Sequence, residues 1–346
     1  MKKKIFLIGI CLILALVALP PLTSAKPAKS IELSFSLFIP EHHLRYQKVW
    51  KPWIKMIEER TKGRVKITPF FASALAPLPE NYDAISKGIA DIGEVLMHAT
   101  PGRFPLTEMV TLPALLPSSL SASKVVWALY DTFPEVKAEY PGVKVMAVYA
   151  SPTCRFETVK KKVYKLEDAK GMKIRVTGPV AVESAEVLGY VPITMPMGDV
   201  YLALERGVVE GVAIPVEVLV SRKWAEVLKY GVGNADLGHD CFCMIFNQDS
   251  WNKLPQEVRK VIDELSGSWM VEFCTSEWDK FEVEAVETAK TKYGVEYTYL
   301  SKEELGRWNK LLEPVKRKYA ESLNAKGLPG TNVLEEAERL AKKLGE

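Results

Sequence analysis

The chain has few of the residues, and none of the motifs, on which most catalytic and metal sites are built. Its 346 residues include only four histidines. Two of these, His42 and His43, are adjacent, so their side chains would point apart on a strand or loop. No GxSxG, HExxH or P-loop motif occurs, and no GxGxxG occurs in a strand–helix context. We therefore do not expect an enzyme, and we predict no cofactor and no metal.

A surplus of charge of one sign is also missing. The chain carries 46 basic and 43 acidic residues, and three of the basic residues, Lys2, Lys3 and Lys4, stand in a segment without acids. The rest of the chain is therefore neutral. A nucleic-acid-binding surface needs a basic patch, so we expect no nucleic-acid partner.

Long apolar runs are absent after the first 25 residues. Before that point, the three lysines precede an apolar run from Ile5 to Leu19, and Thr23-Ser24-Ala25 follows it. A basic start, an apolar stretch too short for a comfortable membrane span, and a small-residue end are typical of a secretory signal peptide. We predict that residues 1–25 are a cleaved signal peptide and that the rest of the chain is exported.

Cysteine pairs with CxxC spacing are absent as well. The cysteines beyond the predicted cleavage site are Cys154, Cys241, Cys243 and Cys274. Cys241 and Cys243 would share one face of a strand. In an oxidising compartment these residues can form one or two disulfides, and reduced, buried thiols are an equal alternative.

The chain does contain a regular alternation of predicted strands and helices. Strands are predicted at residues 31–39, 64–71, 89–95, 153–159, 173–177 and 240–246. Helices are predicted at residues 82–87, 181–188, 200–205, 255–265, 266–292 and 301–323, the last with a capping box from Ser301 to Glu304. This pattern predicts an α/β fold. The chain is longer than one core usually holds, so we expect two lobes.

A short internal similarity supports two related lobes. Residues 84–91, AISKGIAD, and residues 203–210, ALERGVVE, share the pattern A-[IL]-x-[KR]-G-[IV]-[AV]-[DE]. Each segment would form the end of a helix, a glycine turn and the start of a strand, and each ends in an acidic residue. A chance match within α/β sequences is the alternative. Two related lobes would suit a ligand cleft between them.

The strand at residues 173–177 contains an arginine whose role is open at this point. Met172, Ile174 and Val176 would face one side, and Lys173, Arg175 and Thr177 the other. On a half-buried strand the default is that Arg175 faces water. The alternative is that its planar guanidinium binds an anion, because it matches a carboxylate in a bidentate manner.

The residues around this strand resemble the signature of the substrate-binding proteins of TRAP transporters, the DctP-type periplasmic solute receptors. The similarity rests on the run GMKIRV at 171–176, Leu188-Gly189, MPMGDVYLAL at 195–204 and GVVEG at 207–211. Flanking pieces agree, among them ERTKGR at 59–64, Gly88–Asp91, Leu112-Pro113 and WNKLP at 251–255. The resemblance covers nearly the whole predicted mature chain in order.

This resemblance implies a periplasmic, two-lobed α/β binding protein of the type II-like kind, with a ligand cleft between the lobes and long C-terminal helices. We expect lobe I to comprise residues 26–152 and 240–280, and lobe II residues 153–239 and 281–346. Such a protein would close on a small organic acid and deliver it to a membrane permease of a small and a large subunit. We expect a monomer.

The resemblance also implies the ligand-binding residues. The arginine of the KIRV segment, Arg175, would bind the ligand carboxylate, and Arg155 matches a second arginine that commonly precedes it. Where members that bind sugar acids carry polar residues, this chain has Phe38, Leu78 and Ile214. Other predicted wall residues are Met197, for which ordinary packing is an equal alternative, His42, for which a solvated loop is the alternative, and Phe242 of the HDCF segment at 239–242.

These apolar replacements lead to a hypothesis about the ligand. A pocket that cannot form hydrogen bonds to hydroxyls should reject polyhydroxylated acids. We therefore expect a monocarboxylate with an apolar or aromatic body. A receptor for a C4-dicarboxylate or a sugar acid, or a sensor component of the same fold, is the alternative.

Overall fold

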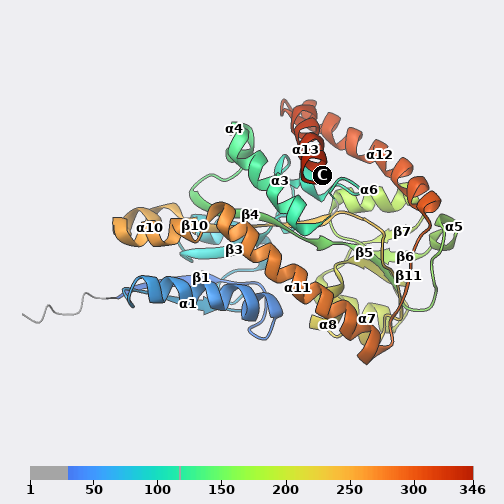
Figure 1. Cartoon of the computed structure of the whole chain (residues 1–346), viewed down its shortest axis with the longest axis horizontal. Helices are drawn as coiled ribbons and strands as arrows, with labels where there is room; N and C mark the ends of the chain where they lie inside the picture. The colour runs from blue at the N-terminus through green and yellow to red at the C-terminus, as the bar shows by residue number, and fades with distance from the viewer. Residues whose placement is uncertain (1–29, 117, 346) are drawn as a thin grey trace, which may run out of the picture.

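The computed structural model describes residues 30–116 and 118–345, so the predicted signal peptide lies outside the described residues. These residues form two β-sheets that lie side by side along the molecule, with helices packed on them (Figure 1). No helix within these two ranges is long and apolar enough to cross a membrane. The two-sheet architecture confirms the predicted α/β fold class.

The first sheet has five strands in the order β2-β1-β3-β10-β4. β1 runs parallel to β2 and β3, whereas β10 runs antiparallel to β3 and β4. The strands are β1 (Ile31–Ser36), β2 (Val65–Phe70), β3 (Ile92–Leu96), β4 (Val143–Thr153) and β10 (His239–Asn247). Alternate residues of β10 enter opposite cores: Cys241 and Cys243 join one apolar cluster, and Phe242 joins the other. The shared face predicted for the two cysteines is thus confirmed.

The second sheet has six strands in the order β11-β9-β5-β8-β6-β7. All neighbours run parallel except β5, which is antiparallel to both β8 and β9. The strands are β5 (Arg155–Thr158), β6 (Lys173–Arg175), β7 (Val191–Ile193), β8 (Gly211–Ile214), β9 (Tyr230–Val232) and β11 (Glu296–Thr298). Phe156 and Ile174 enter the cluster on one face, and Val212 and Ile214 the cluster on the other.

Ten shorter helices accompany the sheets in the described part of the chain. They are α1 (Lys51–Arg60), α2 (Asn81–Ser86), α3 (Ser119–Thr132), α4 (Pro134–Lys137), α5 (Leu166–Ala169), α6 (Pro179–Leu188), α7 (Val200–Glu205), α8 (Val216–Ser221), α9 (Gln248–Lys253) and α10 (Gln256–Glu264). Each packs an apolar side on a sheet or on a neighbouring helix. Trp50, Trp53, Trp251 and Trp308 are buried.

Three longer helices end the chain: α11 (Gly267–Tyr293), α12 (Lys302–Asn324) and α13 (Gly330–Gly345). α11 has 27 residues and is therefore about 40 Å long. It runs diagonally past both sheets (Figure 1), with Trp278 in a first-sheet cluster and Ala289 in a second-sheet cluster. α13 packs on α3 beside the first sheet. The lobe boundaries stay a prediction.

The start of α12 differs from the predicted capping box. Ser301 Oγ accepts a hydrogen bond from the backbone N–H of Glu304, as predicted. The Glu304 carboxylate, however, accepts from the backbone N–H of Leu166 and from Arg307, and it does not return to Ser301. The acid thus ties α12 to α5, because a tertiary donor replaces the local one.

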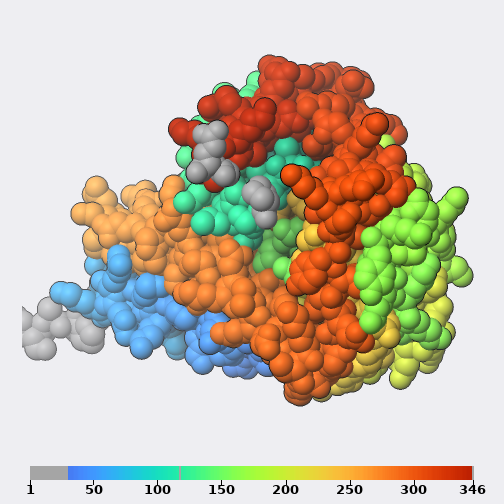
Figure 2. All heavy atoms as spheres, turned by 45° about the vertical axis from the view of Figure 1, so that its right-hand side comes forward, coloured from blue at the N-terminus to red at the C-terminus, as the bar shows by residue number. Residues whose placement is uncertain are grey.

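Two of the passages of the chain between the sheets are neighbouring segments. β4 leads into β5 at Cys154, and β9 leads to β10 through Leu237 and Gly238. The backbone N–H of Cys154 donates to the carbonyl of Gly238 (2.8 Å), and the N–H of Leu237 donates to the carbonyl of Cys154 (3.1 Å). We call these two hydrogen-bonded segments the crossing pair. Figure 2 shows the surface hollowed between α11 and α12, with green residues at the bottom.

The internal similarity corresponds to a repeated local structure. Gly88 and Gly207 both have positive φ, 77° and 71°, as a helix-ending turn requires. The acids that follow act alike: Asp91 Oδ2 accepts from the backbone N–H of Ser34, and Glu210 Oε2 from that of Lys173. Each carboxylate therefore ties its turn to the neighbouring region of its own sheet, at β1 in one case and β6 in the other.

Candidate ligand-binding site

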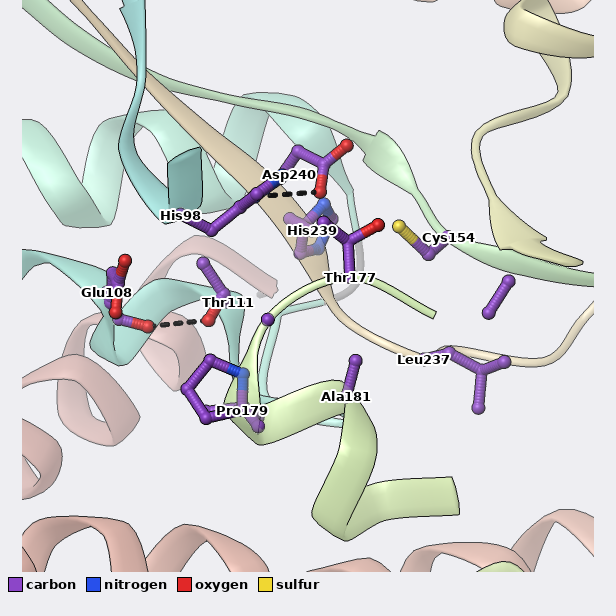
Figure 3. Close-up of a pocket in the computed structure, with 13 residues that line it drawn as sticks. His98, Glu108, Thr111, Cys154, Thr177, Pro179, Ala181, Leu237, His239 and Asp240 are labelled. Carbon is purple, nitrogen blue, oxygen red and sulfur yellow. Dashed lines mark hydrogen bonds and ion pairs between the residues drawn. The ribbon is translucent and has the colours of Figure 1, made fainter. Parts of the chain in front are cut away.

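A cavity lies between the two sheets, next to the crossing pair (Figure 3). Its free volume is about 40 Å³, which is well below that of an open small-molecule site, so the two walls lie close together. The first-sheet side supplies His98, Glu108, Thr111, His239 and Asp240. The second-sheet side supplies Cys154, Thr177, Gly178, Pro179, Val180, Ala181, Ala213 and Leu237. The cavity therefore has both polar and apolar walls, and it is lined from both sheets.

Arg175 ends strand β6 beside this cavity. Thr177 and Gly178, which follow it, line both the cavity and a second hollow that Arg175 itself lines. Arg175 is only 3% exposed, so the default reading of the strand pattern, in which it faces water, is wrong. Its Nε and Nη1 have no hydrogen-bond partner. Burial lowers the pKa of Arg175, and the carboxylate of Asp240 opposes that shift.

The first strand of the second sheet places Arg155 differently. Arg155 is half-buried and lies opposite Ile214 in the β5–β8 pairing. The charge of Arg155 lowers the otherwise raised pKa values of Glu157 and Glu282, both of which are buried. Arg155 is therefore partly compensated by acids, in contrast to Arg175.

An acid and an imidazole form the first-sheet wall nearest Arg175. His98 Nδ1 lies 3.4 Å from Asp240 Oδ1. Burial lowers the pKa of His98, and the neighbouring Asp240 opposes that shift. Figure 3 shows this pair on one side of the cavity and Thr177 and Cys154 on the other. His239 is occupied elsewhere, because its ring nitrogens contact the carbonyls of Ser151 and Leu116.

The cavity residues do not form a reactive thiol. Burial raises the pKa of Cys154 well above its ordinary value, so Cys154 is a neutral thiol. Cys154, Cys241, Cys243 and Cys274 are all free in the structure, which favours the reduced alternative. Among residues 30–116 and 118–345, no group of three or more His, Cys, Asp or Glu side chains could hold a metal ion.

A buried cation and aromatic rings form a second feature on the first-sheet side. The Arg45 guanidinium lies 5.2 Å from the ring centre of Phe38, 4.6 Å from that of Phe242 and 4.7 Å from that of Trp278. Its Nε is 3.0 Å from Glu94 Oε1, which also accepts from the Tyr149 hydroxyl. We call this group the Arg45 cluster.

The Arg45 cluster meets the second sheet through Glu217. Glu217 follows β8 and is 2% exposed, and its backbone N–H donates to Glu282 of α11. Its Oε2 lies 4.0 Å from His43 Nε2. Burial raises the pKa of Glu217 to about 7, although the charge of Arg45 opposes this shift.

The predicted wall residues fall in three places. Phe38 and Phe242 lie together in parallel, with ring centres 6.4 Å apart, and Leu78 packs on the same apolar cluster. Met197 and Ile214 belong to the apolar cluster of the second sheet, and on β8 it is Ala213 that lines the cavity. His42 is exposed, whereas His43 is buried.

Several residues of this region were missed from sequence. Arg45 and His43 follow the strand predicted at residues 31–39, Glu94 lies in the strand predicted at residues 89–95, and Glu217 lies where no element was predicted. Charged residues are normally solvated, so none of them stood out from sequence. Asp240 belongs to the HDCF segment that was expected to contribute wall, and His239 and Asp240 do line the cavity. The one signal in the sequence that could have indicated a buried role for Arg45 is its position next to an aromatic residue, Tyr46.

Comparison with known proteins identifies the family. The family model described as bacterial extracellular solute-binding protein, family 7 (DctP), matches residues 35–322. A curated solute-binding protein of Verminephrobacter eiseniae is 27% identical over 51% of this chain and 53% of its own length. The chain thus matches about half the length of that relative.

Two solved structures are similar over much more of the chain. A marine metagenome TRAP solute-binding protein, described as specific for aromatic acid ligands, has a TM-score of 0.86 and 28% identity, covering 91% of this chain and 99% of that one. A TRAP periplasmic solute-binding protein from Bordetella bronchiseptica with bound mandelate has a TM-score of 0.82 and 27% identity, covering 91% and 99%. The chain therefore belongs to bacterial extracellular solute-binding protein family 7, as the sequence signature predicted.

Proposed function

We propose that this chain is the solute receptor of a TRAP transporter and that it binds a monocarboxylate with an apolar or aromatic body through Arg175. The observation that carries the proposal is the buried guanidinium of Arg175, which has two nitrogens without a partner beside a cavity between the sheets. A buried charge without a partner is unfavourable, and a bidentate carboxylate would supply the missing acceptors.

The apolar part of the proposal is supported by the cavity walls and by the similar proteins. Leu237, Val180, Ala181 and Ala213 give the cavity its apolar surface. Two similar solute-binding proteins, at 28% and 27% identity, are described with an aromatic acid and with mandelate. In the proposed role the receptor is exported, carries no enzymatic activity and delivers its ligand to the small and large permease subunits.

The test is thermal melting of the ligand-stripped protein against phenylacetate, succinate and gluconate. A ligand at a hundred times its dissociation constant adds about 2.7 kcal/mol of stability. We expect phenylacetate alone to raise the melting temperature, and Arg175→Ala to abolish the shift. Arg206→Ala, at an exposed arginine of the same sheet region, is the matched control and should respond like the wild type.

Other outcomes would redirect the proposal. A shift with succinate or gluconate alone would identify a dicarboxylate or sugar-acid receptor. Equal responses of Arg175→Ala and the wild type would remove Arg175 from the site. Uptake in cells that express the permease subunits with and without this chain would separate a transport receptor from a sensor component.

A further inference from the structure

A groove lies at the edge of the second sheet where strands β6 and β8 begin, at the end of the molecule away from α10 (Figure 1). Its free volume is about 380 Å³, against about 40 Å³ for the cavity between the sheets, and the two share no lining residue. Met172, Leu204 and Val209 are buried and give it an apolar floor. We call this feature the β6–β8 groove. Its volume is within the range in which proteins bind ligands.

Four cations surround the floor of the β6–β8 groove. Lys160, Lys161, Lys173 and Arg206 line the groove, and all four are exposed. None of them forms an ion pair with a carboxylate of the described residues. Lys161 donates to a backbone carbonyl, that of Asp168. The positive charges of the groove are therefore available to a partner.

Two carboxylates also line the groove, but they do not balance the four cations. Glu210 accepts a hydrogen bond from the backbone N–H of Lys173, and Glu205 is exposed. The groove thus has a surplus of positive charge, although the chain without its first 25 residues is neutral. A local surplus of this kind attracts a negatively charged partner.

The repeated turn beside the first sheet shows how such a cation is compensated elsewhere in the chain. Lys87 occupies the position of Arg206 in the repeat, and its Nζ lies 3.8 Å from Asp83 Oδ2. At the position of Asp83 the second turn has Leu202, which is 47% exposed. The second turn therefore lacks the compensating acid and exposes an apolar side chain in its place.

A second apolar side chain stands at the rim of the groove. Val208 lies between Gly207 and Val209, which both line the groove, and it is 53% exposed. Hydrated lysines need no partner, but apolar surface beside them is stabilised when it is covered. The combination favours a partner that carries both negative charge and an apolar group.

The shape of the groove indicates what kind of partner fits. The floor is buried and lies between long, exposed side chains, so a flat bilayer surface would not reach it. An inorganic anion would contact the cations and leave the floor uncovered. An extended peptide segment can place acids on the cations and insert one side chain between them.

We propose that the β6–β8 groove binds an extended acidic segment of a partner protein, with its acids on the four cations and an apolar side chain on the floor. The inference goes beyond the proposed function. The groove shares no lining residue with the ligand cavity, and its occupant does not depend on which acid binds there.

The test is fluorescence anisotropy of a labelled Glu-Asp-Leu-Asp-Glu peptide with the full protein. We expect binding that weakens as NaCl rises from about 50 mM to about 0.3 M, because exposed charges are screened by salt. The peptide with serine in place of leucine should bind about tenfold more weakly, because it leaves the floor uncovered. A Lys-Arg-Leu-Arg-Lys peptide should not bind.

Charge reversal locates the binding on the protein. The double variant Lys160→Glu, Lys173→Glu should weaken binding of the acidic peptide by about tenfold or more, because two attractions become repulsions. Lys87→Glu, in the first repeated turn, is the matched control and should leave peptide binding unchanged. All three lysines are exposed, so the variants should melt close to the wild type.

Leu202→Asp copies the arrangement of the first turn into the second. It changes no cation, but it gives Arg206 the acidic partner that Lys87 already has. We expect it to weaken peptide binding by about threefold. Leu202→Asn has the same shape without the charge, and it should weaken binding less than Leu202→Asp.

Three results would overturn the inference. The first is no binding of the acidic peptide by the wild type, or equal binding by the wild type and the double variant. The second is displacement of the peptide by inorganic phosphate at equal concentration, which would identify a simple anion site. The third is binding of phosphatidylglycerol vesicles through the same lysines without binding of the peptide, which would identify a membrane-facing surface.

Discussion

The carboxylate of Glu217, which follows strand β8 of the second sheet, lies 4.0 Å from the imidazole of His43, which follows β1 of the first. Both side chains are almost fully buried. Burial and the nearby Arg45 lower the pKa of His43, while burial raises the pKa of Glu217 to about 7. This contact between the sheets is therefore sensitive to pH in the neutral range.

Glu217→Gln should change how stability depends on pH. A carboxyl group whose folded-state pKa is raised from 4.5 to about 7 stabilises the folded state below pH 4.5, and that contribution is lost as the pH rises towards 7. The glutamine side chain does not titrate, so the variant does not lose this stability as the pH rises. Its free energy of unfolding, relative to wild type, should therefore increase between pH 4.5 and 7, by up to about 3 kcal/mol.

Urea unfolding at several pH values measures this difference. Glu321→Gln, at an exposed position on α12, is the control and should parallel the wild type. Parallel profiles for Glu217→Gln and wild type would show that Glu217 titrates normally.

Arg175→Met should stabilise the protein without ligand and abolish ligand binding. The unpartnered, buried guanidinium costs free energy, and an apolar side chain of similar length removes that cost. We expect a gain of about 1–3 kcal/mol in the free energy of unfolding. Loss of the charged partner should cost the ligand about 2–5 kcal/mol of binding free energy. Melting with and without phenylacetate measures both effects, with Arg206→Met as the exposed control. A variant that melts lower than the wild type without ligand would contradict the prediction.

The position of Arg175 shows what the alternation of residues along a strand can and cannot predict. Alternation along residues 172–177 correctly puts Arg175 opposite Ile174. Alternation cannot distinguish a face turned to water from one turned to another sheet, because both accept a charged residue. Only the family signature indicated that this face is functional.

Residues that meet across the sheets were beyond sequence reasoning. Arg45 and Glu217 are 172 positions apart, and their proximity depends on how β1 and β8 are aimed at one another. By contrast, the helix ends at Gly189 and Gly207 were predicted correctly, because a positive φ at a glycine is a local requirement. Ile214 shows how a sequence alignment can miss a wall residue by one position. Neighbouring residues of β8 face opposite sides, so Ala213 lines the cavity and Ile214 lies in the core.

Arg45→Met should destabilise the fold strongly. Removal of the guanidinium leaves the Glu94 carboxylate buried without its cation, 3.0 Å from where Nε stood. Breaking a buried pair in this way typically costs 3–5 kcal/mol, so we expect about that loss. The double variant Arg45→Met, Glu94→Gln should be more stable than Arg45→Met alone. Urea unfolding of both single variants and the double variant gives the coupling energy. A simple sum of the two single losses would contradict the pairing.

The two repeated turns should differ in strength despite their common pattern. Asp91 accepts from the N–H and hydroxyl of Ser34 and from the hydroxyl of Ser250, and it is half-buried. Glu210 is exposed, and the backbone N–H of Lys173 donates to its carboxylate. Asp91→Ala should cost about 2–3 kcal/mol and Glu210→Ala about 0.5–1 kcal/mol. Equal losses in thermal unfolding would show that the shared turn, and not the number of hydrogen bonds, sets the stability.

The crossing pair has a mechanical consequence. Two adjacent strands held by hydrogen bonds from Cys154 to Gly238 and from Leu237 to Cys154 form a ribbon, and a ribbon twists about its length far more readily than it shears. Gly238, with φ of 91°, holds a backbone conformation that favours glycine, and a Cβ there would overlap the Thr111 carbonyl, so the ribbon packs closely on the first-sheet side at this point. Any movement of one sheet against the other must deform this ribbon together with α11, which packs on both sheets. Cys154 and Leu237 of the ribbon both line the cavity, so a deformation of the ribbon would be felt directly at the cavity wall.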